Sequence, residues 1–267
     1  MDGGTTGGPN AWLIGDVEHP DFAETVALLR ATANIGLALP ELIVVAQSRP
    51  GTIGLRAIER LRRSAPLAGM VALLGSWCEG ETRTGRPAAG VRRLYWYEFP
   101  CWWRRQLALR EAGQCPEWAW GEDRGLMIAD CRLEERSNRF VLETNRWDTA
   151  ATLEDLLKSV GGETIWLRPG SEHVAIRGVA AGIWEGGQLN DAEAERLTAC
   201  CARLAAVNAP VVALLDFPRR DRCEVARRAG AAAVLGKPWL NVDLLATLRQ
   251  VIGQAQPSCI SPSPCAA

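Results

Sequence analysis

The stretch that decides the fold is NAPVVALLDFPRRDRCEVARRAGAAAVLGKPWLNVDLLATLRQ, residues 208–250. Its continuous apolar runs have the length of strands buried on both faces, and its other segments have the spacing of amphipathic helices. The predicted elements are, in order, a strand at 211–215, a helix at 223–229, a strand at 232–235 that leads into Lys237-Pro238, and a helix at 242–252. This alternation predicts a parallel sheet covered by helices, the α/β class.

The same alternation occurs twice along the chain. The second half also has predicted strands at 126–129, 164–167 and 179–184, helices at 152–160 and 191–206, and a polar excursion at 132–148. Asn190 is the predicted N-cap of the helix that follows it. The first half has predicted strands at 12–15, 41–46, 70–74 and 94–97, helices at 21–33, 53–64 and 101–112, and a polar, glycine-rich loop at 79–90.

Length and composition place these two series in separate modules. The chain has 267 residues, and a domain typically has roughly 100–200. The predicted organisation is a flexible N-terminus at 1–10, a first module at 11–113, a linker at 114–123, a second module at 124–253, and a disordered tail rich in proline and serine at 254–267.

The charge balance argues against several classes of partner. The formal net charge is −1, with 48% hydrophobic and 23% charged residues, which is typical of a soluble globular protein. Broad electrostatic capture of nucleic acid or of an anionic membrane is therefore not expected. No apolar run reaches the roughly 18 residues of a membrane span, and the N-terminus lacks the features of a secretory signal. A cytoplasmic protein is predicted.

Motifs for metal binding and catalysis are missing from the sequence. The nine cysteines form no Cys-x-x-Cys pair and are accompanied by only two histidines, so we predict reduced structural thiols and no metal site. His19 and His173 are isolated, and neither a Gly-x-Ser-x-Gly motif nor a glycine-rich phosphate loop is present. We expect no cofactor and no enzymatic activity.

Three segments carry a resemblance to a known family. They are Arg228-Ala-Gly-Ala, which a strand and Lys237-Pro238 follow, then Asn241-Val-Asp-Leu-Leu, and, in the first half, Glu41-Leu-Ile-Val-Val-Ala-Gln-Ser-Arg-Pro-Gly. Over 11–113 and 124–253 the chain resembles a tandem of divergent response-regulator receiver domains. The resemblance implies two flavodoxin-like modules. It also implies phosphoryl transfer to an aspartate at the end of the central strand, assisted by Mg²⁺ and further carboxylates.

The residues in the implied acceptor positions depart from that chemistry. In the first module the acceptor position falls on Ala46, which cannot form an acyl phosphate. In the second it falls on Ile183 or Trp184, and Glu185 follows one or two positions late. A glutamate there could imitate a charged state, but a slip of one residue along a strand reverses the face of the side chain.

The other implied site residues are also incomplete. Asp16 and Asp130 stand where the family places Mg²⁺ ligands, but neither belongs to a complete cluster of two carboxylates. The position of the family's serine or threonine corresponds to Ser76 in the first module and Leu215 in the second. Each module thus has fragments of a degenerate receiver site, and phosphorylation is predicted to be lost.

Lys237 and Pro238 have two interpretations. The lysine could pair with an anion or with Glu185 at the carboxyl ends of the strands, where open α/β sheets bind ligands. Alternatively, the Lys-Pro pair serves only to fix the turn between the last strand and the last helix.

Tryptophans are concentrated around the end of the first module. The chain has 11 tryptophans, and those of this region are Trp96, Trp102, Trp103, Trp118 and Trp120. One hypothesis is an aromatic docking surface made by Trp96, Trp102 and Trp103 with Arg104 and Arg105, because such residues dominate binding hot spots. The alternative is that the two modules dock on each other and that the rings fill the junction between them. Neighbouring acidic residues weaken a nucleic-acid interpretation of the arginines.

The sequence therefore favours a non-catalytic signalling or scaffold protein that acts through an unknown protein partner. Two alternatives stay open. One is a response regulator phosphorylated at a shifted carboxylate such as Glu185 or Asp130. The other is a sensor of a small anion or nucleotide at the carboxyl ends of the strands in the second module.

Overall fold

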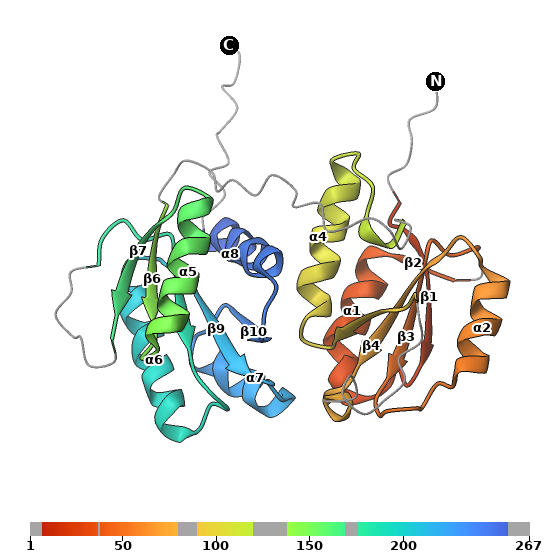
Figure 1. Ribbon diagram of the computed structural model, residues 1–267, viewed down its shortest axis with the longest axis horizontal. Helices are drawn as coiled ribbons and strands as arrows, with labels where there is room; N and C mark the ends of the chain where they lie inside the picture. Colours follow the sequence, from red (N-terminus) through yellow and green to blue (C-terminus); the bar gives the residue numbers. More distant parts are fainter. Residues whose placement is uncertain (1–6, 37, 80–89, 120–137, 169–175, 256–267) are drawn as a thin grey trace, which may run out of the picture. The chain divides into compact units, whose positions relative to one another are not determined.

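Short apolar runs form two separate parallel sheets. The computed structural model describes residues 7–36, 38–79, 90–119, 138–168 and 176–255 (Figure 1). The chain divides into two units, Met1–Ala129 and Asp130–Ala267. Within the described residues each unit has a sheet of five strands, ordered β2-β1-β3-β4-β5 and β10-β9-β8-β6-β7. All strand pairs are parallel.

The strand order establishes the fold of each unit. Numbered along its own unit, each sheet has the order 2-1-3-4-5, which is the doubly wound, flavodoxin-like arrangement. The predicted fold class, α/β with two such modules, is confirmed. The module boundaries proposed from the sequence, 11–113 and 124–253, stay a prediction, because the chain between 120 and 137 lies outside the described residues.

The first unit follows its predicted elements closely. Its elements are β1 (Asn10–Gly15), a 3-10 helix (Pro20–Phe22), α1 (Ala23–Thr32), β2 (Asn34–Ile35), β3 (Leu42–Gln47), α2 (Leu55–Ser64), β4 (Gly69–Leu74), a 3-10 helix (Ser76–Cys78), β5 (Arg92–Tyr95), α4 (Phe99–Glu111) and a 3-10 helix (Glu117–Ala119). Among the described elements, β2, two residues long, and the short 3-10 helices Ser76–Cys78 and Glu117–Ala119 have no counterpart in the predicted series. Most of the predicted loop at 79–90 lies outside the described residues.

The second unit corrects one prediction. Its elements are β6 (Arg139–Glu143), α5 (Trp147–Ser159), β7 (Glu163–Leu167), β8 (Ala181–Glu185), α6 (Asp191–Ala205), β9 (Val211–Asp216), α7 (Arg220–Arg228), β10 (Ala233–Lys237) and α8 (Asn241–Ala255). The segment 132–148, predicted as a polar excursion, contains β6, which pairs with both β7 and β8. The strand predicted at 126–129 lies outside the described residues.

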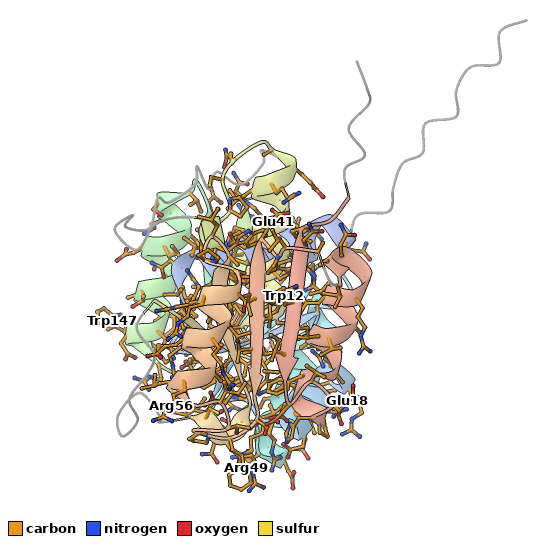
Figure 2. All side chains as sticks on the ribbon, turned by 90° about the vertical axis from the view of Figure 1, so that its right-hand side faces the viewer. Trp12, Glu18, Glu41, Arg49, Arg56 and Trp147 are labelled. Carbon is orange, nitrogen blue, oxygen red and sulfur yellow. The ribbon has the colours of Figure 1, made fainter. Side chains whose placement is uncertain are left out.

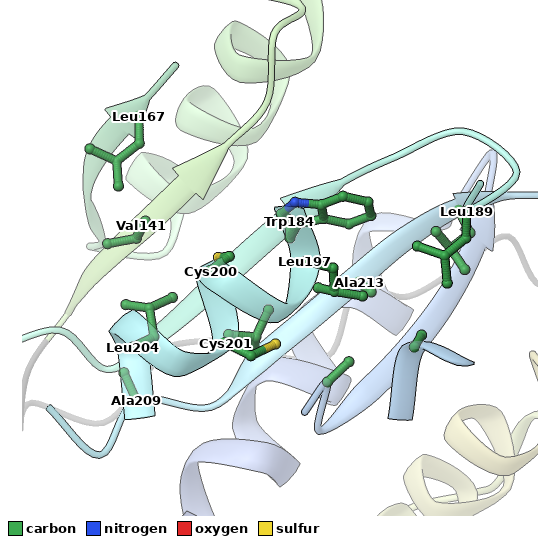
Figure 3. Close-up of a cluster of buried hydrophobic side chains, with 14 of the residues drawn as sticks. Val141, Leu167, Trp184, Leu189, Leu197, Cys200, Cys201, Leu204, Ala209 and Ala213 are labelled. Carbon is green, nitrogen blue, oxygen red and sulfur yellow. The ribbon is translucent and has the colours of Figure 1, made fainter. Parts of the chain in front are cut away.

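Helices bury both faces of the second sheet. One core cluster joins Trp184 and Val141 of the sheet to Leu197 and Leu204 of α6 (Figure 3). The opposite cluster joins the sheet to α5 and α8, for example Ile183 to Leu153. Gly182 permits the close approach of α6, because a Cβ there would lie 2.3 Å from Cδ1 of Leu204.

The ends of α6 and α8 test two further predictions. Asn190 caps α6 as predicted, in a capping box with Glu193. The predicted tail at 254–267 begins too early, since α8 continues to Ala255. The other tail residues lie outside the described residues, as do 1–6 of the predicted N-terminus. None of the described helices combines the length and the apolar character that a membrane crossing requires.

Candidate functional site at the carboxyl ends of the strands

Polar side chains gather where the parallel strands of the second unit end. Because parallel strands present their carboxyl ends at one edge of the sheet, residues far apart in sequence meet there. Thr144 follows β6, Glu185 ends β8, Asp216 ends β9 and Lys237 ends β10. The pairing register places Lys237 opposite Asp216.

Glu185 is the buried centre of this group. Its side chain is 4% exposed, and its Oε1 lies 2.9 Å from Nζ of Lys237. Its Oε2 accepts a hydrogen bond from Oγ1 of Thr144, and Oγ1 of Thr149 lies 3.4 Å from Oε1. Both carboxylate oxygens therefore have partners. The interpretation of Lys237 as a partner of Glu185 is confirmed.

Lys237 bridges two carboxylates of different exposure. Its side chain is 16% exposed, and its Nζ lies 3.1 Å from Oδ1 of Asp216, whose side chain is 47% exposed. A cis peptide bond joins it to Pro238. Lys237 and Lys158 are the only lysines of the chain, whose cationic side chains are otherwise arginines.

The central strand of the second unit buries both predicted acceptor positions. Ile183 and Trp184 are fully buried, on opposite faces of the sheet. Glu185 is the residue whose carboxylate lies at the edge, beside Lys237. Leu215 is also fully buried, and β9 continues to Asp216. The sequence reading missed Asp216 and Thr144, although a polar residue that ends a buried apolar strand is a usable signal in both cases.

The residues at the end of β6 are not the predicted acidic residue of the second unit, Asp130. Asp130 lies outside the described residues. Glu143, the last residue of β6, pairs with Arg203 of α6 and not with Lys237. Among the described residues, Thr144 is thus the contribution of β6 to the group around Glu185.

The first unit has carboxylates at the same edge, held by hydrogen bonds. Oδ2 of Asp16 accepts hydrogen bonds from the backbone N and Oγ of Ser48. Oδ2 of Asp21 accepts one from the backbone N of Ser76 at 2.8 Å. Ala46 is fully buried, as expected for a position without chemistry. Ser48 and Asp21 were missed, because a loop and a 3-10 helix supply them and neither residue ends a strand.

Figure 2 shows the edge of the first sheet. Arg49 and Glu18 lie beyond the carboxyl ends of β3 and β1, and Glu41 marks the opposite edge. The first unit contains no lysine, and β5 ends at Tyr95. Within the part of the chain that the structure describes, His, Cys, Asp and Glu side chains form no group of three that could hold a metal ion.

Most of the described cysteines have the surroundings of structural thiols. Those at 78, 101, 200, 201 and 223 are buried and the one at 115 is exposed, and none of the six forms a disulfide. Burial raises the pKa of Cys201 to about 11, and burial followed by the charge of Glu143 raises that of Cys200 further. A thiol whose pKa is raised has little thiolate at neutral pH and is a weak nucleophile.

The aromatic docking surface predicted for the first unit is wrong for its three rings. Trp102 and Trp103 are fully buried and Trp96 is 4% exposed. Nε1 of Trp103 donates to Oγ1 of Thr32 in α1, and the Trp103 ring stacks on Trp118. These contacts lie inside the first unit, so the rings are part of its own core.

Of the two arginines assigned to that surface, Arg104 is exposed and Arg105 is half-buried. Arg105 pairs with the buried carboxylate of Glu117, as does Arg92 at 2.5 Å. Nε1 of Trp102 donates to the same carboxylate at 2.9 Å. Burial alone would raise the pKa of Glu117, but these partners outweigh it and hold the pKa below its ordinary value.

The lowered pKa of Glu117 predicts acid sensitivity of the first unit. A carboxyl whose pKa is lower in the folded state stabilises the fold above its unfolded pKa, 4.5, and loses this contribution as the pH falls through the folded pKa. We expect Glu117→Gln to lower stability at neutral pH and to flatten the loss below 4.5. Urea unfolding across this range measures both effects. Glu111→Gln, at an exposed position, is the control, and an equal acid slope in both variants would contradict the assignment.

Comparison with known proteins gives likenesses of structure alone. No family model and no curated protein matches the chain. It is similar to a response regulator receiver protein from Pseudoalteromonas atlantica, at 21% identity over 44% of this chain and 99% of that chain, with a TM-score of 0.38. It is similar to the RcsC C-terminus of E. coli, which contains a linker region and a phosphoreceiver domain. The identity is 14% over 95% of this chain and 96% of that chain, and the TM-score is 0.34.

A third similar structure is the signal receiver domain of a signal transduction histidine kinase from Syntrophus aciditrophicus. The identity is 14% over 49% of this chain and 98% of that chain, and the TM-score is 0.37. The two parallel sheets fit two receiver-like modules, and their common strand order is the flavodoxin-like one.

Proposed function

We propose that the chain is a cytoplasmic signalling or scaffold protein that works through contact with a protein partner. In this proposal its receiver-like units are pseudo-receivers, and the partner is itself a signalling component. The observation that carries the proposal is the pairing of Lys237 with the buried carboxylate of Glu185.

The contacts and the burial of the Glu185 carboxylate oppose its use as a phosphoryl acceptor. An acyl phosphate forms when a free carboxylate oxygen attacks the phosphorus, with a metal ion to neutralise the charge that builds up. In Glu185 one oxygen contacts Lys237 and the other accepts a hydrogen bond from Thr144. Both contacts would have to break in a side chain that is 4% exposed.

The pairing of Lys237 with Glu185 holds the carboxyl edge of the second sheet in one arrangement. A new phosphoryl group would attract the lysine only by drawing it away from carboxylates that it already contacts at 2.9 and 3.1 Å. The ammonium group is thus neutralised in the unmodified chain. We infer that the edge of this sheet holds one arrangement permanently, as suits a scaffold with a constant binding surface.

The first unit supports the same proposal. The Oδ2 atoms of Asp16 and Asp21 accept hydrogen bonds from Ser48 and from the backbone of Ser76. Since this unit contains no lysine, it has no equivalent of Lys237 to respond to a modified aspartate.

Intact-mass measurement tests the loss of phosphoryl transfer. The full chain is incubated with acetyl phosphate and Mg²⁺, and we expect its mass to stay unchanged, because both oxygens of the buried Glu185 carboxylate already have partners and the Oδ2 atoms of Asp16 and Asp21 accept hydrogen bonds. A receiver domain that is known to accept phosphate from acetyl phosphate serves as the positive control. An adduct of one phosphoryl group would overturn the proposal, and its position in a peptide map would distinguish Glu185 from Asp130 and Asp16.

A further inference from the structure

A groove opens at the carboxyl edge of the second unit, away from Lys237. Its cavity volume is about 510 Å³, and its lining residues are Asn145, Trp147, Trp166, Arg168 and Arg196. Sites for small molecules typically measure roughly 300–1,000 Å³. The sequence reading singled out none of these five residues.

The groove lies at the carboxyl ends of β6 and β7, beside the topological switch point between β6 and β8. Asn145 and Trp147 come from the connection of β6 to α5, Trp166 and Arg168 from the end of β7, and Arg196 from α6. The helices α5 and α6 cover opposite faces of the sheet. In open α/β sheets, ligands bind in the crevice outside the carboxyl ends of the strands at this point.

Two arginines give the groove its charge. The guanidinium of Arg168 lies 4.8 Å from the ring centroid of Trp166, and that of Arg196 lies 5.8 Å from the centroid of Trp184. Among the described residues, Arg168 has no carboxylate partner, and the Glu193 contact of Arg196 is long, at 3.8 Å. A guanidinium that stacks on a ring keeps its edge available for bidentate contact with a phosphate.

Two tryptophans give the groove aromatic faces of different mobility. The Trp166 ring is fixed, because its Nε1 donates to the backbone O of Thr144 at 2.9 Å. Trp147 is 71% exposed and projects from the surface in Figure 2. An exposed indole face offers stacking to a planar base, and the Asn145 amide supplies a donor and an acceptor for the edge of that base.

We propose that this groove binds a nucleoside phosphate, with the base stacked on Trp147 and the phosphate held by Arg168 and Arg196. The combination of stacking faces, an amide and two guanidinium groups matches the three chemical parts of such a ligand. This site is separate from the group around Glu185 and does not depend on the absence of phosphoryl transfer.

Isothermal titration calorimetry on the full chain tests the proposal with AMP, GMP and UMP as probes. We expect saturable binding of one molecule per chain by at least one of them. Inorganic phosphate, and the nucleoside of whichever nucleotide binds most tightly, are each expected to bind about tenfold more weakly or worse than that nucleotide, because each lacks one of the recognised parts. No saturable binding of any nucleotide at millimolar concentration would overturn the proposal, as would phosphate that binds as tightly as the nucleotides.

Matched variants locate the site. Trp147→Ala and Arg168→Gln are each expected to weaken nucleotide binding about tenfold or more, with unchanged circular dichroism because both side chains are exposed. The first unit offers a matched pair, Arg49 over Trp77 at 5.6 Å, with Trp77 69% exposed. Trp77→Ala and Arg49→Gln are expected to bind like the unchanged protein. If the groove variants bind equally well, the site lies elsewhere and the proposal fails.

Discussion

Replacement of Lys237 by methionine is expected to lower the free energy of unfolding of the second unit by about 3–5 kcal/mol. The methionine has a similar size, so the packing of the stem is retained. What is lost is the positive charge 2.9 Å from Oε1 of Glu185, a side chain that is 4% exposed. The carboxylate would then be buried with only the hydroxyls of Thr144 and Thr149 as partners.

The reciprocal change is expected to cost less. In Glu185→Gln, Nζ of Lys237 still pairs with Oδ1 of Asp216 at 3.1 Å. Because the Asp216 side chain is 47% exposed, water can also solvate this pair. The double replacement Lys237→Met with Glu185→Gln is expected to recover most of the loss, since no buried charge is left unpaired. Urea unfolding of the four proteins completes a double-mutant cycle for the pair.

The other lysine provides the control for this cycle. Lys158 pairs with Glu154 on the exposed side of α5, where the two side chains are 59% and 42% exposed. Lys158→Met is therefore expected to leave the unfolding midpoint unchanged. If Lys237→Met and Lys158→Met unfold at the same urea concentration, Lys237 does not hold the strand edge together, and the fixed-state argument fails.

Truncation of a core tryptophan is the second large effect, in the first unit. Trp102→Ala is expected to cost about 3–5 kcal/mol of unfolding free energy. The ring is fully buried, its centroid lies 5.4 Å from that of Phe99, and its Nε1 donates to Glu117. The variant thus creates a cavity and removes one partner of a buried carboxylate.

Trp77→Ala is the control for Trp102→Ala in the same unit, because Trp77 is 69% exposed. A surface change of this kind is expected to stay within about 0.5 kcal/mol. Unfolding followed by circular dichroism compares the two. Equal midpoints would show that Trp102 does not support the core and would reopen the hypothesis of an aromatic docking surface.

The reason that the sequence left the aromatic cluster open between a docking surface and buried rings is physical. Tryptophan and arginine occur together both at binding hot spots and in cores where arginines neutralise a buried acid. The sequence contains no signal that distinguishes the two cases. The decisive fact is the position of Glu117, which meets Arg92 and Arg105 only after the chain has folded back from α4.

The first strand of the second unit was missed for a related reason. Residues 126–129 and the run Phe140–Glu143 are both short and apolar enough for a strand, and periodicity does not separate them. Pairing shows that Arg139–Glu143 forms β6, which has β7 on one side and β8 on the other, whereas residues 126–129 lie outside the described part of the chain. Whether a segment has a neighbouring strand on each side depends on the whole sheet, so the sequence of the segment alone does not reveal it.

The sequence by itself determined the α/β class, the two series of strands and helices and the N-cap at Asn190, because these depend on local periodicity and on where apolar runs end. It offered the pairing of Lys237 with Glu185 only as one of two interpretations, and the structure decided between them. Only the tertiary structure decided which carboxylates surround Lys237, that Trp102 and Trp103 are core residues, and that two arginines and two tryptophans share a groove. Those facts depend on strand order, which brings distant strand ends to one edge and leaves no mark in any single segment.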